Sequence, residues 1–259
     1  MRDRVAKWLV EQGYPLEMRV ASALRRSEFW VRQSTHYIDP ETGKSREIDV
    51  IATQGEPLGM AEIHFVVECK ATSKPWVLFT SPHTLNNFNH IFALGICSDG
   101  ARGALAQKVE DLAAALPWFK KDDRVGYNLT EAFTTSGDNA YSAAIGAVKA
   151  CMFLLQSTVR SHTPPLIFTF PAIVIQSQLV ECSLDEIGEM SVKEIDQGWL
   201  FFSTWIPGFS GTCIRVVSQG GLENFSSEVR DMKNSLEKLI APDVDREWQT
   251  FNGEFQYPK

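Results

Sequence analysis

Apolar residues recur at helical spacing in the first quarter of the chain and then begin to alternate with polar residues. Val5, Trp8 and Leu9 return every three to four residues, which predicts a first helix over 3–12. The segment PLEMRVASALRRSEF, which begins at Pro15, predicts a second amphipathic helix because its apolar residues keep the same period. The N-terminal region is therefore expected to begin with two helices.

Three β-like segments follow this pair of helices. The segments are FWVRQSTHYI (29–38), REIDVIAT (46–53) and IHFVVECKA (63–71). Pro40 and Gly43 predict a tight turn between the first two. Because the connections are short, we expect an antiparallel meander of three strands.

The middle of the chain has the spacing of helices, and the last third returns to β-like segments before a final helix. The expected helices of the middle are 83–94 opened by Pro82, 101–116 ended by Pro117, and 138–160. The expected late elements are one or two strands over 166–182 broken at Pro171, strands over 198–206 and 212–218, a helix over 221–240, and a polar tail.

These elements predict an α/β fold with a mixed central sheet flanked by helices. No internal repeat or linker divides the chain, so we expect one domain over 1–259. Its core motif region would be 14–75, with additional helices over 82–160 and the late strands and C-terminal helix over 166–240.

The amino-acid composition adds to this picture by excluding some classes of protein. Hydrophobic residues make up 44% and charged residues 22% of the 259 residues, which is ordinary for a soluble globular protein. No uninterrupted apolar run approaches the roughly 18–20 residues of a membrane span, and the charged N-terminus does not resemble a secretory signal. The five cysteines are scattered and form no CxxC pair, which favours a reducing cytoplasm over a disulfide framework or zinc site.

The formal net charge of −7 argues against a simple DNA-coating protein. It does not argue against an enzyme that holds a polyanion through metal ions and a local basic groove. The acid is concentrated in 181–196, ECSLDEIGEMSVKEID, whereas the first fifty residues are nearly balanced.

Candidate chemistry begins in the segment FVVECKA (65–71), where a buried strand ends in charged residues. Residues two apart share a face of a strand, so Glu68 and Lys70 point one way while Cys69 points the other way with Val67. In the preceding strand, the same rule places Asp49 on one face and the apolar residues Ile48 and Val50 on the opposite face.

Adjacent strands would bring Asp49 and Glu68 together with Lys70 beside them. Two neighbouring carboxylates repel each other unless a cation lies between them, and hard oxygen ligands suit Mg²⁺. Glu17 lies on the apolar face of the second helix and therefore needs a polar partner, which a shared site under that helix would supply.

This ordered set resembles the PD-(D/E)XK, or restriction-endonuclease-like, nucleases. The resemblance covers roughly 14–75: Glu17 in GYPLEMRVA, Asp49 in REIDVIA, and ECK at 68–70. The glutamate on the helix is most similar to that of the Holliday-junction resolvase and Mrr-type branches. Ile48 stands where many members have proline, and the Q-x-x-x-Y signature of RecB-like exonucleases is absent at Gln107.

The resemblance implies that Asp49, Glu68 and the backbone carbonyl of Cys69 bind a divalent metal, Mg²⁺ or Mn²⁺. It implies that Glu17 is an outer or second-metal ligand and that Lys70 acts on the attacking water. The implied activity is hydrolysis of a DNA phosphodiester, by an endonuclease of DNA processing or of defence against foreign DNA. A homodimer or a partner subunit is expected by the same analogy.

Simpler interpretations stand beside each of these residues. Glu17 is also placed to interact with the dipole of its helix, and Asp49, Glu68 and Lys70 also suit a structural ion-pair cluster. Lys74 is a weak candidate for phosphate contact, since exposed loop lysines are common.

Other chemistries find less support. Trp76 is expected to pack in the core, and His83 and His90 lack the further ligands of an HNH or zinc site. The chain contains neither a G-x-S-x-G elbow nor a P-loop. The sequence thus predicts a metal-dependent deoxyribonuclease, with a non-cleaving binding or scaffold module of the same fold as the alternative.

Overall fold

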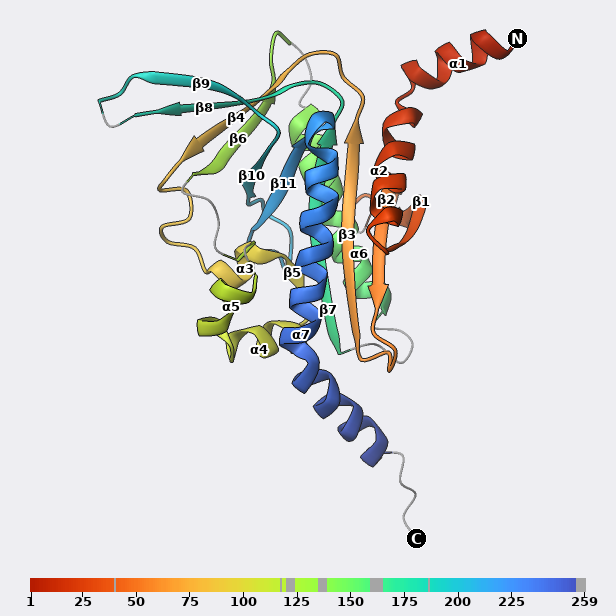
Figure 1. Cartoon of the computed structure of the whole chain (residues 1–259), viewed down its shortest axis with the longest axis vertical. Coiled ribbons are helices and arrows are strands. Elements are labelled where there is room, and N and C mark those ends of the chain that lie inside the picture. Colours follow the sequence, from red (N-terminus) through yellow and green to blue (C-terminus); the bar gives the residue numbers. More distant parts are fainter. Residues whose placement is uncertain are drawn as a thin grey trace.

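A mixed sheet of eleven strands runs through the protein, and helices lie against both of its faces (Figure 1). The computed structural model describes residues 1–254 except 40, 117, 120–123, 135–138, 159–164 and 186. The strand order is β1-β2-β3-β7-β11-β10-β6-β4-β8-β9, and β5 pairs with β7 beside this path. The predicted α/β class with a mixed sheet flanked by helices is confirmed.

The strands are β1 (Trp30–Ile38), β2 (Ser45–Gly55), β3 (Ala61–Lys70), β4 (Trp76–Ser81), β5 (Ile96–Cys97), β6 (Val125–Glu131), β7 (Leu166–Ile175), β8 (Leu179–Leu184), β9 (Met190–Ile195), β10 (Gln197–Phe202) and β11 (Thr212–Ser218). The helices are α1 (Arg2–Glu11), α2 (Tyr14–Arg26), α3 (His90–Leu94), α4 (Asp99–Ala106), α5 (Val109–Ala115), α6 (Asn139–Thr158) and α7 (Leu222–Glu254), with a short 3₁₀ turn η1 (Gln219–Gly221) before α7.

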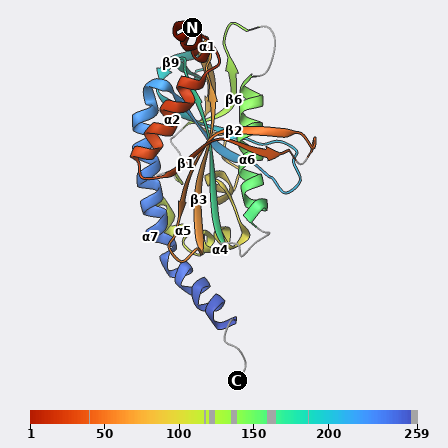
Figure 2. The same cartoon turned by 90° about the vertical axis from the view of Figure 1, so that its right-hand side faces the viewer.

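Two apolar clusters hold the layers together, one on each face of the sheet. One cluster joins α2, α4, α5 and α7 to residues such as Phe65 and Phe170, and the other joins α6 to residues such as Ile51 and Ile173. Figure 2 shows α2 and α7 on one side of the sheet and α6 on the other. Strand β7 is buried along its whole length because both faces are covered.

The N-terminal elements agree with the hydrophobic pattern. Strands β1, β2 and β3 form the expected antiparallel meander, in which β2 pairs with both of its neighbours. Strand β7 then lies parallel to β3 along ten paired positions, from Ala61 opposite Leu166 to Lys70 opposite Ile175. The parallel connection is long and includes α6, as such a crossover requires.

The middle of the chain differs from the prediction of helices over 82–160. Strands β5 and β6 lie within that range, and β4 precedes it. The expected helix over 83–94 is mostly a turn, and α3 begins only after Asn89, whose side chain caps it by accepting the Ile91 N–H at 2.8 Å. The asparagines of this segment favour turns and caps over helix interiors, which explains the late start.

The expected helix over 101–116 is divided into α4 and α5 at Gln107 and Lys108. Lys108 forms an ion pair with Asp243, a buried residue of α7. This contact between distant residues stabilises the turn at Gln107 and Lys108, although the apolar residues keep their helical spacing across these two positions. The proposed stop at Pro117 lies outside the described residues.

Strand β7 does not break at Pro171. Proline lacks an N–H and is excluded from positions that must donate to a ladder. Pro171 lies between the part of β7 that pairs with β5, at Phe168 and Thr169, and the part that pairs with β11, from Ala172 onward. Pro171 therefore lies where the pairing of β7 with β5 has ended and its pairing with β11 has not begun, so neither strand requires its missing N–H.

Helix α7 continues past the predicted end at residue 240 and includes Pro242. Figure 1 shows it bending in its C-terminal part, as a proline inside a helix requires. The buried face continues through Ile240 and Val244, so packing preserves the helix beyond the proline. None of the described helices is both long and apolar enough to cross a membrane.

Candidate active site

The carboxyl end of β3 and the first turn of α2 lie against each other. Gly13, which precedes α2, has a φ of 87°, and a Cβ placed there would lie 2.9 Å from the Cβ of Ala71, just after β3. This close approach and left-handed backbone both favour glycine. The contact places Glu17, in the first turn of α2, beside the charged end of β3.

Strand β2 bends at Asp49, and this bend corrects one prediction. Ile48 and Val50 were expected on one face, but they pack in the two different apolar clusters. The pairing of β1 with β2 skips a single position, Ser34 opposite Asp49, and Ser34 has a φ of 52°. The strict two-residue alternation therefore ends at Asp49, because the hairpin turns there toward α6.

Asp49 is tied directly to β3. Its Oδ2 accepts the backbone N–H of Cys69 at 2.7 Å. The last ladder pair of these strands is Val50 opposite Val67, so Asp49 and Glu68 occupy the next opposing positions. The two carboxylates therefore come from neighbouring positions of adjacent strands, as the sequence predicted.

The alternation of β3 places its charged residues as expected. Lys70 Nζ donates to Glu68 Oε1 at 2.7 Å, so the two side chains share a face. Cys69 packs against the cluster that contains Val67, on the opposite side of the strand. Glu17, Asp49, Glu68 and Lys70 are all half-buried, which leaves the site open to small ligands.

Mutual repulsion and burial raise the pKa values of two of the carboxylates. Burial, followed by the charge of Glu68, raises the pKa of Asp49 to about 7, despite the opposing hydrogen bond from Cys69. Burial, then the charges of Glu47 and Glu68, raises the pKa of Glu17. Burial is the larger cause of both shifts, and the repulsion among these carboxylates adds to it, which a bound cation would reduce.

Lys70 remains positively charged in this environment. Burial acts to lower its pKa, but the charge and the hydrogen bond of Glu68 outweigh it, and the pKa of Lys70 is raised. Burial and then the charge of Asp49 raise the pKa of the Cys69 thiol well above its ordinary value. Lys70 is thus a hydrogen-bond donor rather than a base, and Cys69 contributes its backbone and not a thiolate.

The structure adds two neighbours that sequence reasoning did not identify. A Cβ placed on Gly146 of α6 would lie 3.6 Å from Glu68 Oε2, so α6 presents bare backbone to the carboxylate. Burial and then the charge of Asp39 raise the pKa of Tyr37 to about 12, and Glu68 contributes to this shift. The sequence did contain a signal for the Gly146 contact, because an isolated glycine inside a predicted helix often has a packing or functional reason.

Lys74 and Trp76 lie apart from the cluster. Lys74 is exposed and its Nζ donates to the backbone carbonyl of Phe133 at 3.1 Å. Trp76 is fully buried in the core, as expected. His83 contacts Asn86 at 3.2 Å and His90 lies near the ring of Phe119. Phosphate contact by Lys74 stays a prediction.

The donor set fits a hard divalent cation in part. Among the described residues, no three His, Cys, Asp or Glu side chains are grouped so that all three would hold one metal ion. Glu17 therefore does not complete a ready three-carboxylate cage with Asp49 and Glu68. Mg²⁺ is commonly held by one or two carboxylates while it keeps several waters, and the half-buried Asp49 and Glu68 meet that requirement.

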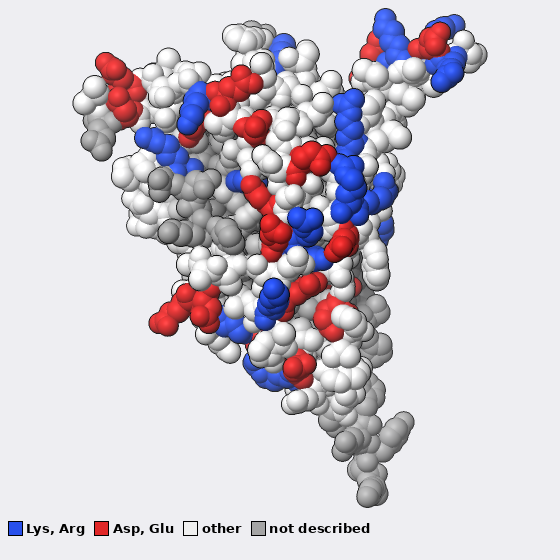
Figure 3. Space-filling model, in the orientation of Figure 1, with Lys and Arg blue, Asp and Glu red and all other residues white. Residues whose placement is uncertain are grey.

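Figure 3 shows one face of the molecule, on which Lys and Arg are interspersed with Asp and Glu. Arg26 of α2 forms an ion pair with Glu223 of α7. A face of this kind offers no uniformly basic surface to a polyanion.

Comparison of the chain with protein-family models, with curated proteins and with solved structures yields no match. The side chains of the site are therefore the basis for a functional proposal.

Proposed function

We propose that this protein is a nuclease that hydrolyses phosphodiester bonds of DNA with bound Mg²⁺ or Mn²⁺. The observation that carries the proposal is the position of Asp49 and Glu68 at opposing places of β2 and β3, with Lys70 bonded to Glu68. Burial and Glu68 together raise the pKa of Asp49 to about 7. Such strongly perturbed groups, held together in an open site, are characteristic of functional centres.

Asp49, Glu68 and the backbone carbonyl of Cys69 would hold the metal, with Glu17 as an outer or second-metal ligand. A divalent cation supplies positive charge that favours ionisation of a water and neutralises the phosphate. The ammonium of Lys70 is fixed by its 2.7 Å bond to Glu68 and remains charged. Lys70 therefore orients the attacking water and stabilises the negative charge that develops on the phosphate.

The arrangement of the elements supports the same proposal. Helix α2 and the meander of β1, β2 and β3 stand in the order that the resemblance to restriction-endonuclease-like enzymes implies, and β4, α3, β5, α4, α5 and β6 come between this meander and α6. The carboxylates lie where the meander ends. The proposed setting is DNA processing or defence in the cytoplasm, with a second copy or a partner subunit assisting the grip on DNA.

Cleavage of plasmid and branched DNA by the purified chain tests the proposal. We expect cleavage with Mg²⁺ or Mn²⁺ and none after chelation. The Lys70→Ala variant should lose about 100- to 1,000-fold in rate, because it removes a donor that stabilises developing negative charge. Asp49→Ala should abolish both cleavage and metal binding measured by calorimetry.

Lys7→Ala is the matched control, since Lys7 is an exposed lysine of α1 whose Nζ lies 3.9 Å from Glu11, outside the cluster. It should keep cleavage within a few fold of the wild-type rate. Equal losses in Lys70→Ala and Lys7→Ala would count against a role for Lys70 in the reaction. Absence of metal binding by the wild-type protein would overturn the proposal.

A second candidate is a non-cleaving interaction module that keeps this fold, and the β8–β9 hairpin favours it. This hairpin lies at the end of the sheet and extends from the body (Figure 1). It exposes Leu184, Ile187, Met190 and Val192, and exposed apolar residues gathered on one element mark interaction surfaces. The acidic segment 181–196 recognised in the sequence is this same hairpin.

The two candidates predict different responses to substitution. An interaction module should lose stability when Glu68 or Lys70 is replaced, because the pair would then be a structural ion pair. A nuclease should lose activity in the same variants while its unfolding temperature changes little.

A further inference from the structure

A second hollow lies on the α6 side of the sheet, away from the carboxylates. It is a cavity of about 300 Å³ between β6, β10 and the first turns of α6. The sequence analysis identified none of its lining residues as functional. Its volume is at the lower end of the range for small-ligand sites, which suits a single ring system.

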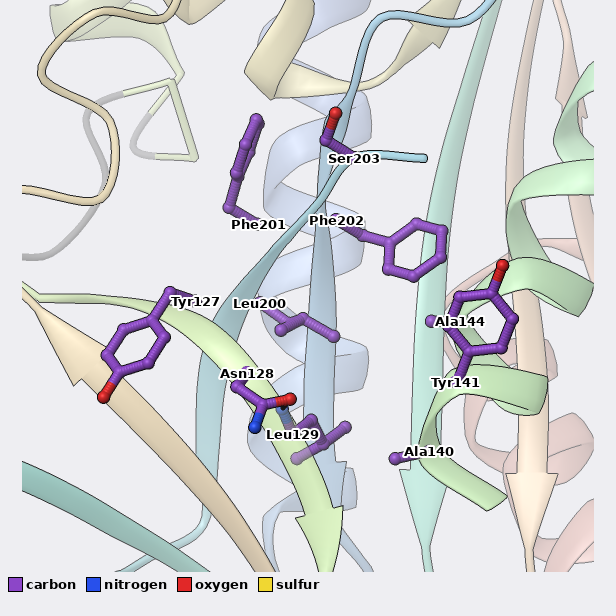
Figure 4. A pocket seen from close by; sticks show the side chains of 10 residues that line it. All are labelled: Tyr127, Asn128, Leu129, Ala140, Tyr141, Ala144, Leu200, Phe201, Phe202 and Ser203. Carbon is purple, nitrogen blue, oxygen red and sulfur yellow. Dashed lines mark hydrogen bonds between the residues drawn. The ribbon is translucent and has the colours of Figure 1, made fainter. Parts of the chain in front are cut away.

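The walls of the cavity are aromatic. Figure 4 shows Tyr127 on one side and Tyr141 with Phe202 on the other, with Leu129 and Leu200 between them. The rings of Tyr141 and Phe202 are 5.8 Å apart at 54°. Tyr127 is 60% exposed and Tyr141 is 44% exposed, so both rings can still be covered by a ligand.

Tyr127 reaches the cavity because β6 contains a bulge. In the ladder between β4 and β6, Phe79 lies opposite Asn128 and Thr80 opposite Gly126, so Tyr127 is the additional residue. Bulges redirect side chains and are frequent next to active sites. A Cβ on Gly126 would collide with Leu78 and lie 2.8 Å from the backbone oxygen of Trp199, so the bulge depends on glycine.

The lining is mixed, with apolar and aromatic residues and a few uncharged polar groups. None of the ten residues that form the cavity is Lys, Arg, Asp or Glu, so the site suits a neutral ligand. Asn128 and Ser203 bring an amide and a hydroxyl to it, and Asn128 Oδ1 is held by the Leu129 N–H at 2.9 Å. A flat apolar slot with hydrogen-bonding groups at its edge matches a nucleobase.

Helix α6 connects this cavity to the carboxylate site. Ala140, Tyr141 and Ala144 line the cavity, and Gly146 of the same helix lies against Glu68. At 1.5 Å per residue, these positions are within about 10 Å of one another along the helix axis. One polynucleotide chain can therefore reach both places.

We propose that this cavity binds an unpaired nucleobase of the polynucleotide that the carboxylate site cleaves. The inference rests on the proposed nuclease function and specifies its substrate as single-stranded DNA or DNA with unpaired bases. A base stacked inside a duplex cannot enter such a slot without leaving the helix. Stacking on tyrosine is sequence-tolerant, so the site selects for unpaired structure rather than for sequence.

Binding of single-stranded DNA tests the inference without chemistry. Fluorescence anisotropy of a labelled oligonucleotide in EDTA should show about 5- to 100-fold weaker binding by Tyr141→Ala, from the usual value of base–aromatic stacking. Tyr141→Phe should bind like the wild type because the ring is retained. The salt dependence should not change, since no charge is removed.

Two further measurements locate the contact. The fluorescence of 2-aminopurine in the oligonucleotide should be quenched by the wild type and less by Tyr127→Ala and Tyr141→Ala. Trp205→Ala, which removes an aromatic residue that is 93% exposed and outside the cavity, is the control and should bind normally. Wild-type binding by Tyr127→Ala and Tyr141→Ala, or an equal loss in Trp205→Ala, overturns the inference.

The cleavage assay separates this inference from the proposed function. Lys70→Ala should fail to cleave, while its binding of the oligonucleotide should still be weakened by Tyr141→Ala as in the wild type. If the wild-type protein binds DNA in a tyrosine-dependent way but never cleaves it, the proposed nucleobase site stands and the proposed nuclease activity is rejected. If cleavage does not depend on unpaired bases and both tyrosine variants bind normally, the proposed nuclease activity stands and the proposed nucleobase site is rejected.

Discussion

At the scale of single residues, a buried charged side chain of this protein lies beside partners of opposite charge. Lys149 of α6 lies almost fully buried, with its Nζ 3.0 and 3.1 Å from the carboxylate oxygens of Asp39 and 2.6 Å from Glu41. The pair attaches the β1–β2 turn to α6. It resembles the Glu68–Lys70 pair in chemistry but is far more enclosed, so its role is structural.

Lys149→Met should therefore be strongly destabilising. Without Lys149, the buried Asp39 keeps Arg46 at 3.7 Å and the amides of Glu41 and Thr42 as partners, so the expected cost is that of one lost buried hydrogen-bonding partner, about 1–3 kcal/mol. Urea denaturation should show a fall of this size in the free energy of unfolding with an unchanged m value. Lys7→Ala is the control, because Lys7 and Glu11 are exposed and 3.9 Å apart, and it should change stability by less than about 0.5 kcal/mol.

The same pair predicts a pH dependence. Burial acts to raise the pKa of Asp39, but the hydrogen bonds from Lys149 and from the Glu41 amide outweigh it, and the pKa is lowered below its ordinary 3.8. A lowered carboxyl pKa gives stability that is present above about pH 4 and is lost as pH falls below it. The difference between wild type and Lys149→Met should shrink below pH 4. A constant difference down to pH 2 would contradict this account.

Two glycines offer a test of close packing. Gly126→Ala should destabilise by about 1–3 kcal/mol, because the added methyl meets Leu78 and the Trp199 backbone in a filled core. Gly103→Ala in α4 should stabilise by about 0.5–1 kcal/mol, since a Cβ there has nothing within 4 Å and alanine favours helix. Thermal unfolding should shift in opposite directions. Similar shifts in both would contradict the crowding at Gly126.

At the scale of elements, the bend of the β1–β2 hairpin decides where Asp49 lies. Ser34 opposite Asp49 has a φ of 52°, a conformation in which side chains are strained. The strain is local to the one position that the ladder skips. The hairpin thus departs from a regular ladder at the residue that we assign to the metal.

Ser34→Gly should accordingly be neutral or stabilising by up to about 1 kcal/mol, because glycine adopts this backbone freely. His36→Gly, two residues along the same strand in a regular pair with Glu47, should destabilise by about 0.5–1 kcal/mol. Chemical denaturation of both variants measures the contrast. A loss of stability in Ser34→Gly equal to that in His36→Gly would show that no strain is stored at the bend.

At the scale of the whole molecule, the proposed metal should couple the helix, the meander and the sheet. A ligand that binds only the folded state adds about 2.7 kcal/mol at a concentration 100 times its dissociation constant. Mg²⁺ should therefore raise the unfolding temperature of the wild type. An unfolding temperature that is the same with Mg²⁺ and with EDTA would contradict metal binding.

Asp49→Asn should remove this Mg²⁺-dependent increase. In metal-free buffer the variant should be as stable as the wild type or more stable by about 1 kcal/mol, because one of several repelling carboxylates is gone. Glu62→Gln on the neighbouring strand β3 is the control, since Glu62 binds His64 at 3.0 Å, and it should leave the metal effect intact. A retained Mg²⁺ effect in Asp49→Asn would exclude Asp49 as a ligand.

The sequence by itself determined the helix pair, the meander and the shared face of Glu68 and Lys70. These features follow from local periodicities of 3.6 and 2 residues, which no distant contact overrides here. It also predicted that Asp49 would come from the strand next to Glu68, as the ladder through Val50 and Val67 places it. The proposed nuclease chemistry rests on these residues together with their resemblance to the PD-(D/E)XK nucleases.

Only the tertiary structure decided the rest, because those features depend on residues far apart in the chain. The division between α4 and α5 at Lys108 depends on the ion pair with Asp243. Strand β7 continues through Pro171 because its pairing with β5 ends before this residue and its pairing with β11 begins after it. Helix α7 continues beyond Pro242 because its buried face stays packed. The bend at Asp49 and the aromatic cavity beside α6 likewise arise where separate elements meet. Periodicity describes one element at a time, whereas such sites are made by the contacts between elements.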